Sequence, residues 1–206
     1  MKITSYDTLP LGKYQQIISM LKREKDDIDA HAAILAIMYD MTENEIMNLP
    51  LQEYMDLSES ISFLLQPLPK FKPRAKDKYV IGDLVLIPTK DIKKFTASQY
   101  IDYQVFLKEG NKMVELVSTL LVPKGCIYGN DYDLAEVYEA VAKMSVTEVA
   151  ELSAFFLQQY KRLIDRSLTY LELELILTTK RRERRSVMKI IRKLRSLIKS
   201  GDGFIK

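Results

Sequence analysis

The longest helical pattern in the chain runs from Val146 to Leu177, and neither proline nor glycine interrupts it. Ser145 with Glu148 forms a potential capping box at its start. A helix of this length cannot be covered by one small core, so we expect part of it to serve an interface or to brace two subunits. The apolar candidates for that interface are Phe155, Phe156, Leu171, Leu173, Leu175 and Leu177, and an ordinary core position is at least as good an interpretation for each alone.

A strongly basic segment, residues 180–199, follows this pattern and holds ten lysines and arginines but one glutamate. The whole chain has 31 basic and 28 acidic residues, which leaves 21 basic against 27 acidic residues elsewhere. The body is thus net acidic, and such segregation bears on partners and self-association rather than on fold. The basic candidates for contact with a partner or DNA are Lys180, Arg181, Arg182, Arg184, Arg185, Lys189, Arg192, Lys193, Arg195 and Lys199.

The second half of the basic segment also carries an apolar stripe at helical spacing. Its members are Val187, Ile190, Ile191, Leu194, Leu197 and Ile198. A freely solvated tail would not need this stripe, so we expect it to be buried against this protein, another subunit or a membrane. The stripe lacks Trp and Phe, which weakens the membrane interpretation. The four arginines between Arg181 and Arg185 could touch DNA phosphates without reading sequence, whereas no interleaved aromatic residues support single-strand stacking.

The first third of the chain predicts four helices. Periodic apolar residues indicate a helix over about 12–24 and a second one carrying Leu35 and Tyr39. Thr42 with Glu45 is a capping box for a short third helix that ends near Asn48. Pro50 stands where a fourth helix can begin, and that helix continues towards Leu65.

The second half is introduced by a proline-rich, basic stretch, residues 67–78, which we interpret as an exposed linker. Residues 79–88 have β-branched side chains on both sides of Gly82-Asp83 and predict a hairpin. Thr96 with Gln99 is another capping box, and the apolar run 113–122 predicts a further helix that Pro123 ends. The turn-rich loop 124–133 is expected to be exposed or an interaction site, and Asp133 can cap the next helix.

The sequence therefore predicts a mainly α (α+β) protein with two related helical clusters. The expected units are 1–66, a linker over 67–78, a second unit over 79–178, and a basic amphipathic arm over 179–206. The relation between the clusters rests on an echo between residues 49–65 and 144–160, in which Leu57 pairs with Leu152 and Ser58 with Ser153. Chance similarity between two amphipathic helices is the alternative.

Catalytic constellations are poorly supported by this composition. His31 is the single histidine and Cys126 the single cysteine, so neither a histidine pair nor a thiolate zinc cluster can form within the chain. Phosphate-binding glycine loops and the nucleophile elbow are absent from the sequence, and acid pairs such as Glu172 and Glu174 are typical of solvated helix surface. We expect a non-enzymatic protein without a metal or cofactor. We also expect it to be soluble, because its start lacks a signal-peptide core and no run is long enough to span a membrane.

Several strings resemble proteins of tailed bacteriophages, especially the crAss-like phages. They are DTLPLGKYQQI (7–17), TENEIMNLPLQEY (42–54), FTASQYIDYQVF (95–106), VELVSTLLVPKG (114–125) and LTYLELELIL (168–177). The N-terminal third is also similar to phage tail-assembly chaperones. The resemblance covers roughly residues 7–177, and none of its strings is a catalytic signature.

What the resemblance implies is a structural protein of the virion, a ring or adaptor of the connector between portal and tail. Its partners would be further copies in a ring and other phage structural proteins such as portal or tail subunits, with non-specific contact to packaged DNA and none to a membrane. One alternative is a tail-assembly chaperone that leaves before maturation. The other is a DNA-binding regulator, for which the sequence supplies no compact helix-turn-helix.

Overall fold

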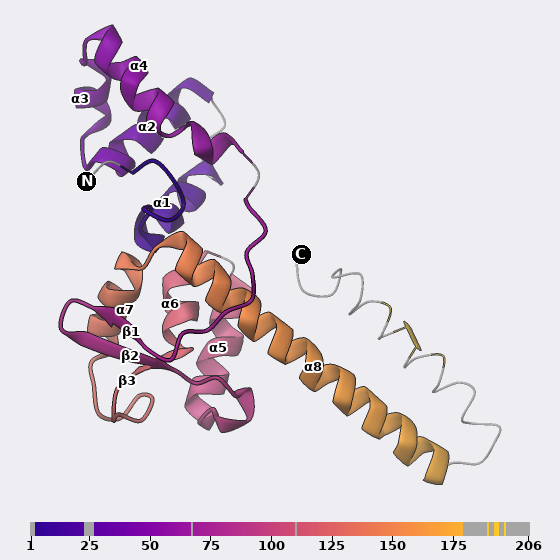
Figure 1. Ribbon diagram of the computed structural model, residues 1–206. Helices are drawn as coiled ribbons and strands as arrows, with labels where there is room; N and C mark the ends of the chain where they lie inside the picture. Colours follow the sequence, from indigo (N-terminus) through magenta and orange to yellow (C-terminus); the bar gives the residue numbers. More distant parts are fainter. Residues whose placement is uncertain are drawn as a thin grey trace. The chain divides into compact units, whose positions relative to one another are not determined.

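The computed structural model describes residues 3–22, 27–66, 68–109 and 111–178, together with Lys189, Arg192, Lys193 and Ser196. The chain divides into two compact units, residues 1–155 and residues 156–206. The described residues are mainly helical with a small antiparallel sheet, which confirms the predicted α+β class (Figure 1). The finer division of the chain at residues 66, 78 and 178 remains a prediction.

The first unit begins with four helices where the sequence predicted them, although the fourth ends at Ser60 and only a 3-10 helix follows towards Leu65. Thr42 and Glu45 form the complete capping box before α3: the Thr42 Oγ1 accepts from the Glu45 amide, and the Glu45 carboxylate accepts from the Thr42 amide. The prolines Pro10 and Pro50 occupy the N-cap positions of α1 and α4. The elements are α1 (Leu11–Leu21), α2 (Asp27–Tyr39), α3 (Glu43–Met47), α4 (Leu51–Ser60) and the 3-10 helix η1 (Ser62–Leu65).

A core of large aliphatic side chains joins these helices. Its centre is fully buried and contains Leu9, Leu35 and Ile46. Val146, from the far end of the sequence, belongs to the same cluster. Burying such side chains contributes about 1.5–3 kcal/mol each, so the N-terminal helices depend on a residue more than one hundred positions away.

The predicted hairpin forms β1 (Tyr79–Ile81) and β2 (Leu84–Pro88), which are antiparallel. Ile81 pairs with Leu84, so Gly82 and Asp83 are the two turn residues. Gly82 has φ +58°, and among the described non-glycine residues positive φ occurs at Asp40 alone. A positive φ at the first central position only is the pattern of a type II′ turn, which requires glycine there.

The prediction of one helix over 113–122 is wrong. α6 (Met113–Ser118) ends early, and β3 (Leu121–Pro123) pairs with β2 to complete a sheet of order β1-β2-β3. Apolar residues without a clear period suit a buried strand as well as a helix. Pairing with β2, some 35 residues earlier in the chain, stabilises residues 121–123 as a strand rather than as a helix. Pro123 is tolerated there because β3 is an edge strand.

Helix α5 (Ala97–Glu109) follows the 3-10 helix η2 (Ile92–Lys94) and is held to α6 by a buried amide. The Thr96 hydroxyl accepts from the Gln99 amide at 3.1 Å, as the predicted capping box requires. The Gln99 side chain does not complete that box. Instead, its Nε2 donates to the Thr119 carbonyl at 2.6 Å. Thr119 is the C-cap residue of α6, where carbonyl groups lack a hydrogen-bond donor within the helix.

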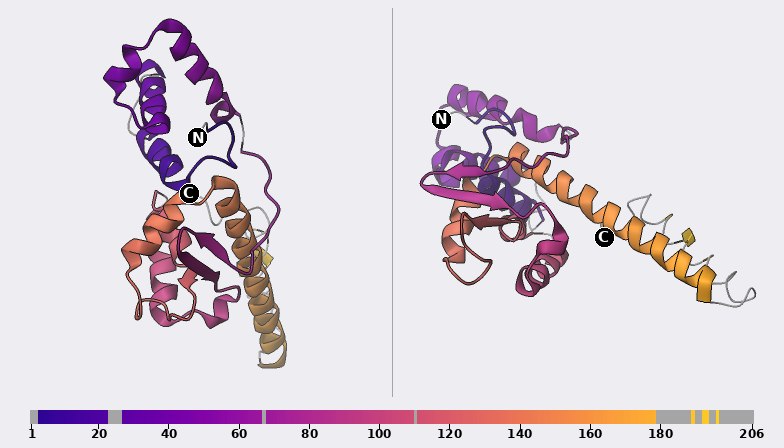
Figure 2. Two further views of the ribbon diagram at one scale, coloured as in Figure 1. Left: turned by 60° about the vertical axis from the view of Figure 1, so that its left-hand side comes forward. Right: turned by 60° about the horizontal axis from the view of Figure 1, so that its bottom comes forward.

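The last two helices are α7 (Leu134–Lys143) and α8 (Val146–Thr178). The Asp133 carboxylate accepts from the Ala135 amide at 2.9 Å, as predicted. α8 is one continuous helix in every view (Figures 1 and 2). In its first turns Val149 and Leu152 are buried, and Phe156, where the second unit begins, is buried as well.

The start of the chain is tied to the junction between α7 and α8 within the first unit. The Leu11 amide donates to the Met144 carbonyl at 2.8 Å, and the Val146 amide donates to the Leu9 carbonyl at 2.9 Å. Gly12 lies against Ala142, where an added Cβ would come within 3.1 Å of the alanine Cβ. Such a contact is tighter than most Cβ contacts in proteins, so a larger residue at this position would require α1 or α7 to shift by a few tenths of an ångström.

Candidate interaction surfaces

The outer face of α4 exposes large apolar side chains. Leu51 is 74% exposed and Met55, one helical turn later, is 57% exposed. None of the ten residues of α4 is fully buried, although Tyr54 and Leu57 pack against the core from its inner face. Met47, at the end of the preceding helix, is exposed as well. A helix whose outward apolar residues are left in water indicates a surface that another molecule covers.

Acidic residues surround these apolar side chains. Asp56 and Glu59 share the outer face with Leu51 and Met55, and Glu53 lies at its edge. From residue 41 to residue 69 the sequence contains five acids and no lysine or arginine. We call Met47, Leu51, Met55, Glu53, Asp56 and Glu59 the α4 surface. Sequence reasoning missed it, although the absence of basic residues from this stretch was visible.

A second apolar surface lies on α5. Tyr103 and Gln99 face inward and are buried, whereas Tyr100, Ile101 and Val105 face outward. Ile101 is 59% exposed. We call Tyr100, Ile101 and Val105 the α5 surface. Unlike the α4 surface it carries few charges, so the two surfaces suit different partners.

A hollow of about 310 Å³ lies between the sheet, α5 and the loop that follows β3. Cys126, Gln99 and Tyr128 are among its lining residues. Cys126 is partly buried and free of a disulfide. The Gln99 Nε2 donates to the Thr119 carbonyl and lies 3.5 Å from the Thr89 hydroxyl, so this nitrogen is already used within the fold.

Tyr128 is the most perturbed titratable group described. Burial, followed by the hydrogen bond that its hydroxyl donates to the Asp102 carboxylate at 3.0 Å, raises the pKa of Tyr128 well above its ordinary value. The side chain is nearly fully buried, so loop 124–133 is not exposed at this residue; the alternative, that the loop is an interaction site, remains a prediction. A tyrosine held protonated in this way anchors the loop to α5 and is a poor general base at neutral pH.

His31 also has a structural environment. Its Nδ1 lies 2.8 Å from the Tyr54 hydroxyl, and the two rings meet edge to face. This contact joins α2 to α4. Among the described residues, no group of three or more His, Cys, Asp or Glu side chains is placed to hold a metal ion.

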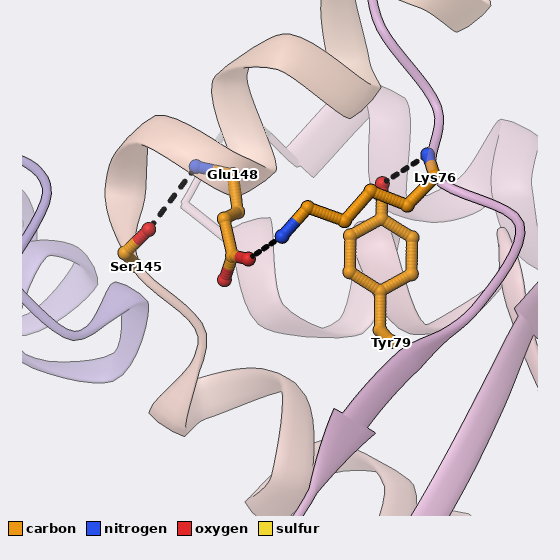
Figure 3. A network of polar contacts seen from close by, with 4 residues as sticks. All are labelled: Lys76, Tyr79, Ser145 and Glu148. Carbon is orange, nitrogen blue, oxygen red and sulfur yellow. Dashed lines mark hydrogen bonds and ion pairs between the residues drawn. The ribbon is translucent and has the colours of Figure 1, made fainter.

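The stretch before the hairpin is exposed but attached (Figure 3). The Arg74 amide donates to the Glu151 carbonyl of α8 at 3.1 Å. The Lys76 ammonium pairs with the Glu148 carboxylate, and the Lys76 amide donates to the Tyr79 hydroxyl at 3.2 Å. The Ser145 hydroxyl accepts from the Glu148 amide at 3.2 Å, so only half of the predicted capping box forms. Residues 74–79 are therefore fastened to the start of α8.

Most of the predicted basic and apolar arm lies outside the described residues. Lys189, Arg192 and Lys193 are described, with helical backbone and exposed side chains. Outside the described part lie Lys180, Arg181, Arg182, Arg184, Arg185, Val187, Ile190, Ile191, Leu194, Arg195, Leu197, Ile198 and Lys199.

The predicted interface residues of α8 divide in the same way. Phe155 is half-buried and Phe156 is buried, which fits core positions for both. Leu171, Leu173, Leu175 and Leu177 are helical, and their side chains lie outside the described part. No helix in the described part of the chain is long and apolar enough to cross a membrane.

A scan against protein-family models, a search of curated proteins and a search of solved structures each found no match to this chain. Its function is therefore inferred from its surfaces, together with the resemblance found in the sequence.

Proposed function

We propose that this chain is a non-enzymatic structural protein of a tailed phage particle, a ring or adaptor component of the connector between portal and tail. The observation that carries the proposal is the pair of separate apolar surfaces on α4 and α5. A ring is closed by head-to-tail contacts, in which each subunit offers two different patches to its two neighbours. Two unlike surfaces on one chain fit this requirement.

The sequence supports the same role through its resemblance to crAss-like phage proteins and through its basic arm. Exposed basic side chains such as Lys189, Arg192 and Lys193 suit an acidic protein partner or the phosphates of packaged DNA. The proposed location is the virion, after assembly in the cytoplasm of the bacterial host. The proposed partners are further copies of this chain and the adjoining portal or tail subunits.

A second candidate is a tail-assembly chaperone, and the methionines of the α4 surface favour it. Met47 and Met55 are exposed, and methionine is common at surfaces that adapt to several clients because its side chain is flexible and polarisable. A chaperone would use the α4 surface transiently and would not remain in the mature particle.

Two measurements test the proposal. Mass spectrometry of purified particles should find the protein at a fixed copy number, and native mass spectrometry should find concentration-dependent oligomers in solution. Absence from particles, with a stable monomer or dimer that binds other tail proteins, would favour the chaperone. Binding of free protein to duplex DNA with a steep salt dependence, without particle association, would favour the regulator.

Variants connect the measurement to the surfaces. The double variant I101K/V105K should shift the oligomers towards monomer, because it places two charges on the α5 surface. V80K adds a single charge elsewhere and is the control, since Val80 is exposed on the hairpin without belonging to either surface. Equal loss of oligomers in both would indicate a non-specific effect of added charge and contradict the role of the α5 surface.

A further inference from the structure

The α4 surface and the basic segment have complementary patterns. The α4 surface presents Leu51 and Met55 among acidic residues, and the stretch 41–69 holds five acids without a base. The residues from Val187 to Lys199 present an apolar stripe among five basic residues without an acid. The described members of that segment, Lys189, Arg192 and Lys193, are helical and exposed, as flanks of such a stripe should be.

We propose that the basic segment of one copy of this chain lies on the α4 surface of a neighbouring copy. The apolar stripe around Leu194 would cover Leu51 and Met55, while the flanking lysines and arginines approach Glu53, Asp56 and Glu59. An amphipathic helix that lays its apolar face on an apolar surface is a common mode of peptide recognition. Complementary charge then fixes the partner and speeds association.

Charge alone would allow another acidic site, but apolar exposure selects α4. Asp83, Glu136 and Glu139 line a hollow of about 350 Å³ beside the hairpin turn. Lys143 lines the same hollow, and none of its lining residues is among the large apolar side chains left exposed. That site offers acidic side chains but no exposed apolar side chains for the stripe to cover, whereas the α4 surface offers acidic and exposed apolar side chains together.

We place the basic segment on a neighbouring copy because the proposed function requires several copies of this chain, and each copy carries both the α4 surface and the basic segment. Disulfide trapping separates this arrangement from a contact within one chain.

Four arginines remain outside the contact. The five basic residues from Val187 to Lys199 already equal in number the five acids of the stretch 41–69, so Arg181, Arg182, Arg184 and Arg185, which precede the stripe, are in excess. In the assembled protein they would stay available for a further anionic partner. The inference therefore rests on the proposed function in one respect, the presence of several copies, and gives the basic segment a role in joining them.

Disulfide trapping in the full-length protein tests the contact directly. In a C126S background, M55C and L194C are placed on separately tagged copies, which are mixed and mildly oxidised. We expect a mixed disulfide between the two tags. The triple variant E53K/D56K/E59K should reduce its initial rate about tenfold, because several facing charge pairs become repulsive. D83K/E136K/E139K changes the same charge at the other acidic site and should leave the rate unchanged.

A charge swap strengthens the design. R192E/K193E on the L194C copy should slow trapping on the unchanged α4 surface and restore part of it on the E53K/D56K/E59K surface. Circular dichroism checks that each variant keeps its helical content. Absence of the mixed disulfide, or an equal rate for both triple variants, would overturn the proposal. A further variant carries M55C and L194C on the same chain. A disulfide that forms only in this variant, at a rate independent of protein concentration, would overturn the neighbouring-copy arrangement in favour of a contact within one chain.

The two proposals fail in distinguishable ways. Trapping in solution without the protein in mature particles would retain the contact and reject the virion role. The protein in particles without trapping would retain the virion role and reject the contact.

Discussion

Two glutamines on α5 have opposite environments and make a matched pair for mutation. Gln99 is only 2% exposed, and its Nε2 donates to the Thr119 carbonyl at 2.6 Å. Gln104 lies five residues later, and its buried Nε2 has no hydrogen-bond partner among the described residues. Methionine has a similar length and volume and cannot donate a hydrogen bond, so Gln99→Met and Gln104→Met differ mainly in what they leave behind.

The expected change in the free energy of unfolding depends on whether the substitution leaves a buried hydrogen-bond partner unsatisfied. Gln99→Met leaves the Thr119 carbonyl, at the end of α6, without its donor in a residue that is fully buried. Leaving a buried polar group unsatisfied costs about 1–3 kcal/mol. Gln104→Met removes a buried donor that loses its hydration on folding and gains no hydrogen bond. We therefore expect no loss of stability and a gain of up to about 1 kcal/mol.

Urea denaturation followed by far-ultraviolet circular dichroism measures both changes, because the chain has no tryptophan but much helix. Each kcal/mol should also move the melting temperature by roughly 2–4 °C for a chain of this size. A Gln99→Met loss below about 0.5 kcal/mol, or an equal loss in Gln104→Met, would refute the assignment of a capping role to the Gln99 amide.

Three further outcomes are expected. Burial and Asp102 raise the pKa of Tyr128, so the contribution of Tyr128 to the free energy of unfolding is fully present below about pH 10, the pKa of an unfolded tyrosine, and falls as pH rises above it. Tyr128→Phe should flatten this alkaline loss when the free energy of unfolding is measured by denaturation at several pH values. An unchanged dependence on pH would contradict the burial of Tyr128. Gly12→Val should lower the free energy of unfolding by about 1–3 kcal/mol, because even a Cβ comes within 3.1 Å of Ala142, and thermal melting checks this. Leu51→Lys should change stability by less than about 0.5 kcal/mol while reducing self-association in sedimentation, and a large loss of stability would show that Leu51 belongs to the core.

Local signals predicted most of the fold. The turn at Gly82-Asp83 and the box of Thr42 with Glu45 depend on neighbours in sequence, and both formed as expected. The boxes at Gln99 and Glu148 formed only by half, because each side chain found a partner elsewhere in the fold. The run 113–122 failed for the same reason: its last residues pair with β2, and no local pattern shows that pairing.

The candidate surfaces were predicted less well than the fold. The basic segment is obvious from composition, but its acidic counterpart on α4 is diluted over nearly thirty residues. The structure shows that the acidic face of α4 points outward, because Tyr54 and Leu57 on the opposite face pack against the core. Similarly, α5 is apolar on both sides, so periodicity alone could not separate the buried Tyr103 from the exposed Ile101.

The bonds that tie Leu9 and Leu11 to Met144 and Val146 determine when this protein can fold during synthesis. The first of these residues leave the ribosome well over one hundred residues before the last. At about 5–20 residues per second, the 135 positions from Leu11 to Val146 take roughly 7–27 s to translate. Throughout that interval the N-terminal helices lack a part of their core, so a nascent chain truncated before α8 should be the form most exposed to proteases and to premature association.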